Sequence, residues 1–270
     1  MRGAVRATTR LTVDGGGRRV RWAHEWPVVL RRTGPHRVHL VHAAGGPLGG
    51  DELGLVVEVG AEARLAVHSA GATLVQPGAG AAAGPAARWT VTARVGAGGR
   101  LHWAPEPTVV SDGAALESTL RVELAPGACA TVREVVVLGR HGQRGGRYSG
   151  GLEVLVGGEP LLVHTTVLDG ADPALCGPAG TAGARAVGTL LGAGDGAVSW
   201  SESGEAAEVR WAWTPLEGPG AVLLAVGTPS AVAAVLDGAG APATSPEAGE
   251  PEQVASGVRS PSRLRRCSPA

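Results

Sequence analysis

The sequence predicts a mainly β protein: stacked β-hairpins in a solenoid-like, layered fold, with a few short helices in the C-terminal third. Two patterns support this fold class. Apolar and polar residues alternate in "RWTVTARV" and "LRVEL", which places valines on one face and Arg, Glu and Thr on the other. In addition, "EVGAEARLAV", "RVGAGGRLHW" and "ELAPGACATV" each run strand, tight Gly/Ala turn, strand. A unit repeated in this way indicates a stack of similar layers.

The strands follow one another between glycine turns in the first two thirds of the chain. We expect them at Arg18–Trp22, Arg37–Val41, Glu52–Val59, Arg64–His68, Arg88–Val95, Arg100–Trp103, Leu116–Leu124, Ala130–Leu138, Gly151–Val156 and Leu161–Leu168. The segment Gly71–Arg88 is expected to form an irregular loop, because it is rich in Gly, Ala and Pro.

The last third changes in character. "ARAVGTLL" (Ala184–Leu191) is expected to form a short helix, and "TPSAVAAVLDG" a second one, with Thr228 as N-cap, Pro229 in the first turn and Gly238 as the stop. We expect residues 1–238 to form a single β-rich domain. Residues 239–270 are rich in Pro, Ser, Gly and charge, which predicts a disordered C-terminal tail.

Composition excludes several classes of function. The chain has no lysine, so a phosphate-binding loop of the G-x-x-x-x-G-K-[ST] type and a pyridoxal Schiff base are both impossible. The formal net charge is zero, which argues against nucleic-acid binding. We find no signal peptide and no membrane-spanning stretch. The 3 cysteines are widely spaced, as in a reduced cytoplasmic protein.

Three histidines lie at intervals of three residues in "GPHRVHLVH": His36, His39 and His42. The Gly-Pro pair argues against a helix, and the valines and leucine favour a strand. Residues in a strand advance by about 3.3 Å each, so His36 and His42 lie roughly 20 Å apart on one face, with His39 on the other. A metal ion holds its ligands at about 2 Å, so the three cannot share an ion. We interpret them as polar positions on a half-exposed strand.

The other local motifs carry no catalytic signature. "GGPLGGD" precedes a strand and not the helix that a dinucleotide-binding loop needs, so a tight turn is expected, with Asp51 bonding to its own backbone. "VHSAG" lacks the first glycine of a nucleophile elbow. Acidic residues are numerous, but their spacing does not show which of them converge. The residues by themselves thus indicate a soluble β-rich domain without an active site.

Four segments, taken in order, resemble the urease accessory protein family UreD, also called UreH. They are "GGPLGGD", "ELGLVVEVGAEARLAVHSAGATLV", "LHWAPEPTVVSDGAALESTLRVELAPGACATVREVVVLGR" and "EPLLVHTTVLDG". The resemblance runs from Arg18 to Asp169 and continues more weakly to Gly238. It departs from the family in "HSAGATLVQP", where leucine and glutamine stand at the usual lysine and tyrosine.

The resemblance implies a non-catalytic chaperone that binds apo-urease together with UreF and the GTPase UreG and assists nickel insertion. It implies a cytoplasmic hetero-oligomer, with no tightly bound cofactor and with nickel passing transiently through an internal polar channel. Carboxylates suit such weak, transient binding of Ni²⁺. The expected nickel-path residues are Asp51, Glu106, Asp112 and Glu134. The alternative is a β-solenoid module, unrelated to nickel, that binds carbohydrate or another protein.

Overall fold

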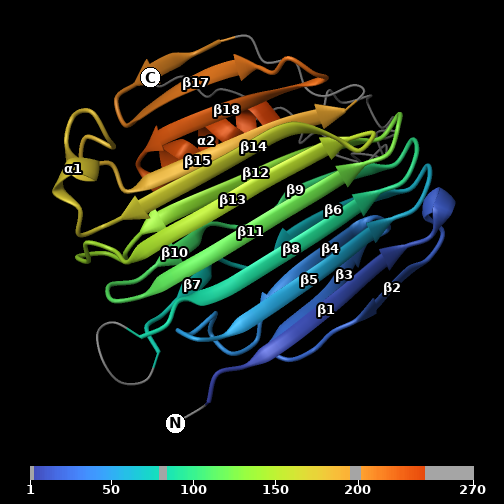
Figure 1. The fold of residues 1–270 in the computed structure, drawn as a ribbon, viewed down its shortest axis with the longest axis horizontal. Helices are drawn as coiled ribbons and strands as arrows, with labels where there is room; N and C mark the ends of the chain where they lie inside the picture. Colours follow the sequence, from blue (N-terminus) through green and yellow to red (C-terminus); the bar gives the residue numbers. More distant parts are fainter. Residues whose placement is uncertain (1–2, 79–83, 195–201, 241–270) are drawn as a thin grey trace, which may run out of the picture.

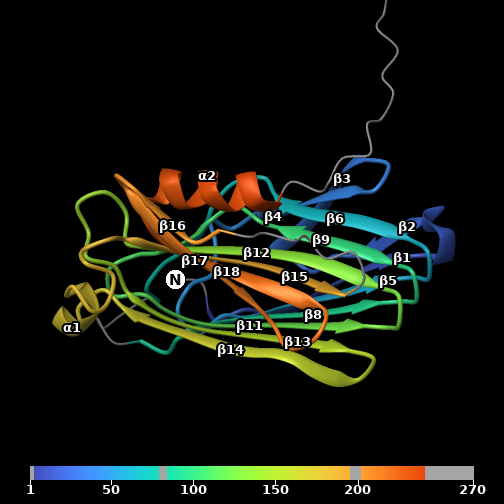
Figure 2. The ribbon, with the colours of Figure 1, turned by 90° about the horizontal axis from the view of Figure 1, so that it is seen from above.

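The structure, a computed structural model, describes residues 3–78, 84–194 and 202–240. Within these residues a pair of β-sheets packs face to face (Figures 1 and 2). The first sheet has the order β2 (Val20–Ala23), β1 (Arg6–Val13), β5 (Glu52–Val59), β8 (Ala87–Val95), β11 (Ala115–Leu124), β13 (Arg147–Val156) and β14 (Glu159–Asp169).

The second sheet has the order β3 (Val28–Gly34), β4 (Arg37–His42), β6 (Arg64–Ser69), β9 (Arg100–Ala104), β12 (Cys129–Leu138), β15 (Ala186–Gly194), β18 (Gly220–Gly227), β17 (Val209–Pro215) and β16 (Gly204–Ala206). Two short strands, β7 (Thr73–Val75) and β10 (Thr108–Val110), pair with each other, and β10 also pairs with β12. The helical segments are η1 (Gly15–Gly17), α1 (Pro173–Cys176) and α2 (Pro229–Gly240).

The predicted fold class is confirmed, and the structure shows how the repeated units stack. Each strand–turn–strand unit places its first arm in the first sheet and its second arm in the second sheet. The first arms β5, β8 and β11 pair in parallel, and so do the second arms β6, β9 and β12. The turns stack with their backbones in close contact. A Cβ atom added to Gly60 would lie 2.4 Å from the amide nitrogen of Gly15. Glycine is therefore required at this stacked turn.

The core lies between the two sheets and consists of Leu, Val and Ala, as the sequence composition requires. Every second residue of a strand points inward, for example Leu55 and Val57 on β5 and Leu65 and Val67 on β6, all of which are buried. This alternation is the period-2 pattern that predicted the strands.

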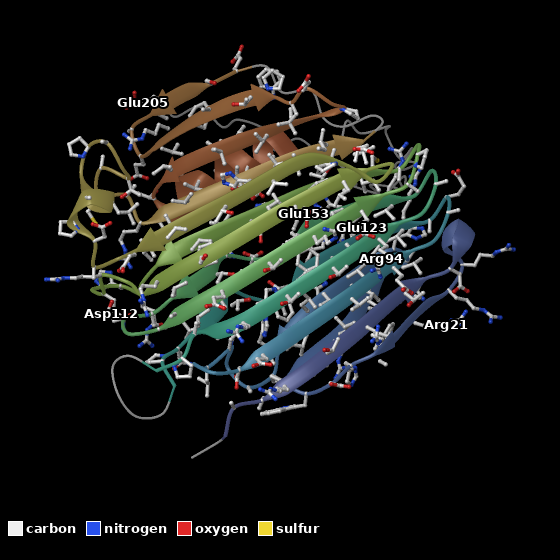
Figure 3. All side chains as sticks on the ribbon, in the orientation of Figure 1. Arg21, Arg94, Asp112, Glu123, Glu153 and Glu205 are labelled. Atoms are coloured by element: carbon white, nitrogen blue, oxygen red, sulfur yellow. The ribbon has the colours of Figure 1, made fainter. Side chains whose placement is uncertain are left out.

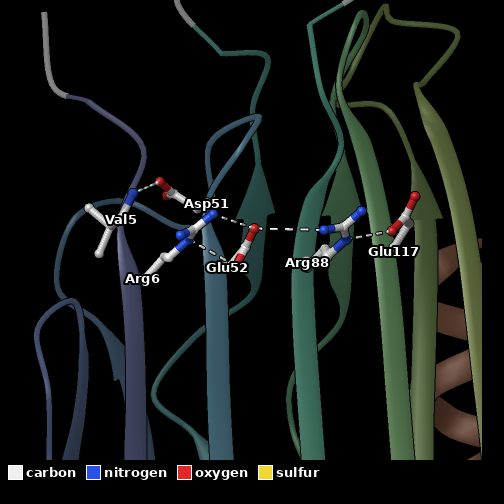
Figure 4. Close-up of polar contacts among 6 residues, drawn as sticks. All are labelled: Val5, Arg6, Asp51, Glu52, Arg88 and Glu117. Atoms are coloured by element: carbon white, nitrogen blue, oxygen red, sulfur yellow. Dashed lines mark hydrogen bonds and ion pairs between the residues drawn. The ribbon is translucent and has the colours of Figure 1, made fainter.

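The outer face of the first sheet is polar and carries rows of ion pairs (Figures 3 and 4). One row crosses four neighbouring strands: Arg6 Nε lies 3.0 Å from Glu52 Oε2, and Arg88 Nε lies 2.9 Å from Glu117 Oε2, with Arg88 also 3.6 Å from Glu52. At the other end of the strands, Arg94, Glu123 and Glu153 lie on the same face. Opposite charges thus alternate across these strands and attract one another. At the edge strand β14 the same face instead exposes the apolar side chains Val163 and Val167.

The predicted helix beginning after Thr228 is confirmed as α2, which covers the outer face of the second sheet (Figure 2). Thr228 Oγ1 accepts a hydrogen bond from the Ala231 amide at 3.4 Å, as expected of an N-cap. The helix continues to Gly240, two residues beyond the expected stop at Gly238.

The predicted helix at Ala184–Leu191 is wrong, because this segment forms strand β15. β15 is covered on one side by the first sheet and on the other by α2, so it is apolar on both faces and lacks the alternation of a half-exposed strand. Gly188 allows this close packing: a Cβ there would lie 2.5 Å from Val232 Cγ1 and 2.7 Å from Leu236 Cδ1.

Further strands were not predicted: β1, β3, β7, β10, β16, β17 and β18. The loop expected at Gly71–Arg88 contains β7 and the beginning of β8, and residues 79–83 lie outside the described residues. Of the expected tail, Ala239 and Gly240 belong to α2, and residues 241–270 lie outside the described residues. Within residues 3–240, as far as they are described, no helix is long and apolar enough to span a membrane.

Candidate functional site

Two small cavities lie between the sheets and meet at Glu134. The first has a volume of about 40 Å³ and the second about 20 Å³. Glu134, Val136 and Tyr148 line both of them. We call the polar side chains that line these cavities the interior polar cluster: His42, Ser69, Thr73, Glu106, Thr108, Ser118, Glu134, Tyr148, His164, Thr166 and Thr189.

Strand alternation sends Glu134 inward. On β12, Val132 and Val136 face the core between the sheets, whereas Arg133 and Val135 face outward beside α2. Glu134 shares the parity of the inward residues, so its carboxylate stands where the pattern calls for an apolar side chain. A buried carboxylate in place of a valine costs stability, and such a position is a functional candidate on physical grounds.

Glu134 lines both cavities and keeps only part of its surface accessible. Burial raises the pKa of its carboxyl to about 7. Among the described residues no hydrogen-bond donor or cation pairs with it. Glu134 is thus balanced near neutral pH between a protonated form and a carboxylate that can bind a cation.

Tyr148, on β13, lies next to Glu134 from the opposite sheet. Burial raises the pKa of its phenol, the charge of Glu134 raises it further, and a side-chain hydrogen bond with Ser118 acts in the opposite direction. The phenol therefore stays neutral and serves as a hydrogen-bond donor or acceptor at the junction of the two cavities.

His42 lines the first cavity. Burial lowers the pKa of its imidazole to about 4, so the ring is neutral at pH 7. Its ring meets Trp89 edge-on, with the centroids 5.5 Å apart. Two buried nitrogens that line this cavity, His42 Nδ1 and Trp103 Nε1, have no hydrogen-bond partner among the described residues. Unpaired buried polar atoms that line a polar cavity can form hydrogen bonds to water molecules or to a hydrated ion in it.

The second cavity ends at His164 on β14, whose Nε2 lies 3.0 Å from Thr166 Oγ1. Together the cavities bring carboxylate, imidazole and hydroxyl groups from both sheets into one polar region inside an otherwise apolar core. This donor set is of the kind that binds a borderline divalent cation weakly.

Two of the four expected nickel-path residues come together at this site. Glu106 and Glu134 line the same cavity, and Glu106 is exposed, so it stands at the outer end of it. The backbone amide of Glu106 donates to Ser69 Oγ at 2.9 Å, which fixes this end of the cavity.

Asp51 and Asp112 line neither cavity. Asp51 is buried and accepts hydrogen bonds from the amides of Val5, at 2.8 Å, and Leu48, at 3.0 Å (Figure 4). The bond from Leu48 is the local one that the tight-turn interpretation predicts, whereas the bond from Val5, which ties the N-terminal strand to this turn, was not predicted. Asp112 is exposed and accepts a bond of 2.6 Å from the Gly145 amide. That either lies on a metal path stays a prediction.

The structure places His39 and His42 on opposite faces of β4, as expected for a strand. His42 points inward with Val38 and Leu40, whereas His39 points outward. Throughout the described ranges of the chain, no group of three or more His, Cys, Asp or Glu residues is arranged to hold a metal. The strand that carries His42 is half-exposed, as expected, but the ring of His42 lies on its inner face against Trp89.

Several members of the interior polar cluster were missed from the sequence: His42, Tyr148, His164 and Thr189. For His42 a signal exists, since it shares the parity of two apolar residues in its own strand. For the other three residues, the inward orientation depends on how the strands pair and could not be read from the sequence alone.

Comparison with known proteins gives the family of the chain. The family model described as "UreD urease accessory protein" matches residues 2–238. The chain belongs to the UreD urease accessory protein family. Among its relatives are the urease accessory protein UreD of Frankia alni, 39% identical with 83% of this chain and 88% of the relative covered, and UreD 3 of Streptomyces griseus, 40% identical with 83% and 90% covered. UreD of Streptomyces coelicolor is 38% identical, with 83% and 91% covered.

Proposed function

We propose that this chain is a urease maturation chaperone that binds apo-urease together with UreF and UreG and assists the insertion of nickel into the urease active site. Membership of the UreD family supports the role in urease maturation. The partners, the cytoplasmic location and the assembly into a hetero-oligomer belong to this proposal.

Nickel is the cargo of the proposed path and is not held as a resident cofactor. The single observation that carries the path is the pair of cavities that meet at Glu134. A carboxylate with a pKa of about 7 exchanges a proton for a cation at little cost near neutral pH. Because no third carboxylate or imidazole closes around the ion among the described residues, binding is weak enough for release.

The steps assigned to this chain's own residues are few. Glu106, at the exposed end of the first cavity, attracts the cation electrostatically. Glu134 releases its proton and stabilises the charge between the sheets, while the neutral rings of His42 and Tyr148 supply lone pairs along the wall. His164, Thr166 and Thr189 line the second cavity beyond. Apart from the proton that Glu134 releases to solvent as the cation binds, the path requires no covalent bond to form or break in this chain, in keeping with a protein that is not itself an enzyme.

The alternative, a β-solenoid module that binds carbohydrate or another protein, has less support. It accounts for the stacked strands, but it gives no reason for a buried carboxylate between the sheets. Family membership also favours the maturation role.

Urease activity and nickel content test the proposal directly. Cells expressing the urease subunits, UreF, UreG and any other accessory proteins are compared with and without this chain. We expect both quantities to collapse without it. Fully loaded and equally active urease in both strains would refute the assignment.

A further inference from the structure

A row of three imidazoles lies on the outer face of the second sheet, apart from the interior polar cluster. His39 on β4, His68 on β6 and His102 on β9 follow one another across parallel strands. The ring centroids of His39 and His68 are 5.4 Å apart, with their planes 26° from parallel, and those of His68 and His102 are 5.5 Å apart. Stacked imidazoles in water-accessible positions need an explanation, because each gives up hydration for little apolar burial.

His39 and His68 are direct register partners on neighbouring strands. Neighbouring strands lie about 4.8 Å apart, so the two side chains leave the sheet side by side. Two imidazole nitrogens that each lie about 2.1 Å from one ion require a separation of this order between the rings.

One of the two rings is oriented by a hydrogen bond: His39 Nδ1 lies 2.7 Å from Thr33 Oγ1. In the tautomer in which Nδ1–H donates to Thr33, the lone pair of Nε2 is available to an ion, as in metal-ligating histidines whose tautomer is fixed by an oxygen acceptor.

The type of ligand decides which ions fit the site. Arg37 and, more weakly, Glu106 act electrostatically on His68. Two imidazoles select a borderline transition metal over Ca²⁺ or Mg²⁺, which prefer oxygen ligands. His39 and His68 are both partly exposed, so water can complete the coordination shell and the site needs no third protein ligand.

We propose that His39 and His68 form a surface site for a divalent transition metal ion, distinct from the cavities between the sheets. The site binds Ni²⁺ or Cu²⁺ through one nitrogen of each ring. It lies on the side of the sheet from which α2 projects, next to the segment that carries Glu106. Its existence does not depend on the role in urease maturation.

The test uses the full chain without an affinity tag and freed of metal. Isothermal titration with Ni²⁺ is compared for the wild type, His39→Gln, His68→Gln and, as the matched control, His36→Gln, an exposed histidine just before the same strand. We expect both single variants to lose the same binding event and the control to retain it. Unchanged nickel binding in either His39→Gln or His68→Gln overturns the two-imidazole site.

Electron paramagnetic resonance with Cu²⁺ as the probe supplies an independent readout of the ligands. We expect modulation from two imidazoles in the wild type and from one in each variant. A single imidazole in the wild type contradicts the proposal. Circular dichroism of each variant separates loss of a ligand from loss of fold, and loss of urease activation without loss of metal binding bears only on the maturation role.

Discussion

Glu134 is the residue at which the packing pattern of the protein and its candidate function diverge. Val132 and Val136, which point to the same side of β12 as Glu134, belong to the core between the sheets, whereas Glu134 places a carboxyl group beside two cavities. A valine there would bury more apolar surface and stabilise the stack. Retaining a titratable group at this position costs stability, and the cost has an explanation if the group handles a cation.

The effect of Glu134 on the free energy of unfolding depends on pH. Its pKa rises from the ordinary 4.5 to about 7 on folding, so the folded state holds the proton more tightly. This proton binding stabilises the folded state fully at pH values below the pKa of Glu134 in the unfolded chain. The stabilisation is lost as the pH rises through the pKa of Glu134 in the folded protein, and the free energy of unfolding falls by about 3 kcal/mol in total.

We therefore expect Glu134→Gln, which has no charge to bury, to gain stability relative to the wild type between about pH 5 and about pH 8. Urea denaturation of both proteins at several pH values measures the gap. His42, whose pKa is lowered to about 4, titrates in both proteins, so its contribution cancels. A gap that does not change across this range would contradict the burial of an ionisable Glu134.

Local residue chemistry explains what was predictable from the sequence at this scale. The turn role of Asp51 follows from a short aspartate after glycines, and the structure shows the expected bonds to nearby amides. The convergence of Glu106 and Glu134 was not predictable, because it depends on which strands pair. His42 is intermediate, since its parity with Val38 and Leu40 was visible in the sequence but its three-residue spacing from the other histidines drew attention to a shared ligand set.

Among the elements, α2 and β15 show where helix and strand signals succeed and fail. A Thr-Pro pair stands at the start of α2. A helix start of this kind can be recognised in the sequence, because it depends only on adjacent residues. β15 was mistaken for a helix because burial on both faces removes alternation, and only length and neighbours then distinguish the two. The two elements are coupled, since Gly188 of β15 opens the space that Val232 and Leu236 of α2 fill.

This coupling predicts that α2 depends on Leu236, which is fully buried. We expect Leu236→Ala to lower the free energy of unfolding by about 2–5 kcal/mol through the cavity that it leaves. Ala234→Ser, on the exposed side of the same helix, is the control and should change it little. Urea denaturation checks both. A cost for Leu236→Ala no larger than that of the control would mean that α2 does not pack against β15 as described.

At the scale of the whole molecule, the alternation of the chain between two sheets creates the site. The long strands β5, β6, β8, β9, β11, β12 and β13 alternate between the two sheets, so residues of β12 and β13 that are near in sequence face each other across the core. The repeated strand–turn–strand units predicted the layered stack. They did not reveal that the arms of a unit lie in different sheets, because a turn of a given length can join either arrangement.

The same architecture leaves two outer faces of different character. The first sheet carries alternating ion pairs, such as Arg88 with Glu117. The second sheet carries α2 and the row of His39, His68 and His102. Glu117 and Glu134 thus have the same side chain in opposite environments, one on the solvated face and one between the sheets.

The measurement that tests the central claim most directly exploits this contrast. Urease is matured in cells with the wild-type chain, Glu134→Gln or Glu117→Gln, and the nickel content of the purified urease is determined, together with the amount of each variant that co-purifies with UreF, UreG and urease. We expect Glu134→Gln to assemble normally but to yield urease poor in nickel, and Glu117→Gln to yield fully loaded urease. Fully loaded urease from the Glu134→Gln strain would contradict a cation path between the sheets.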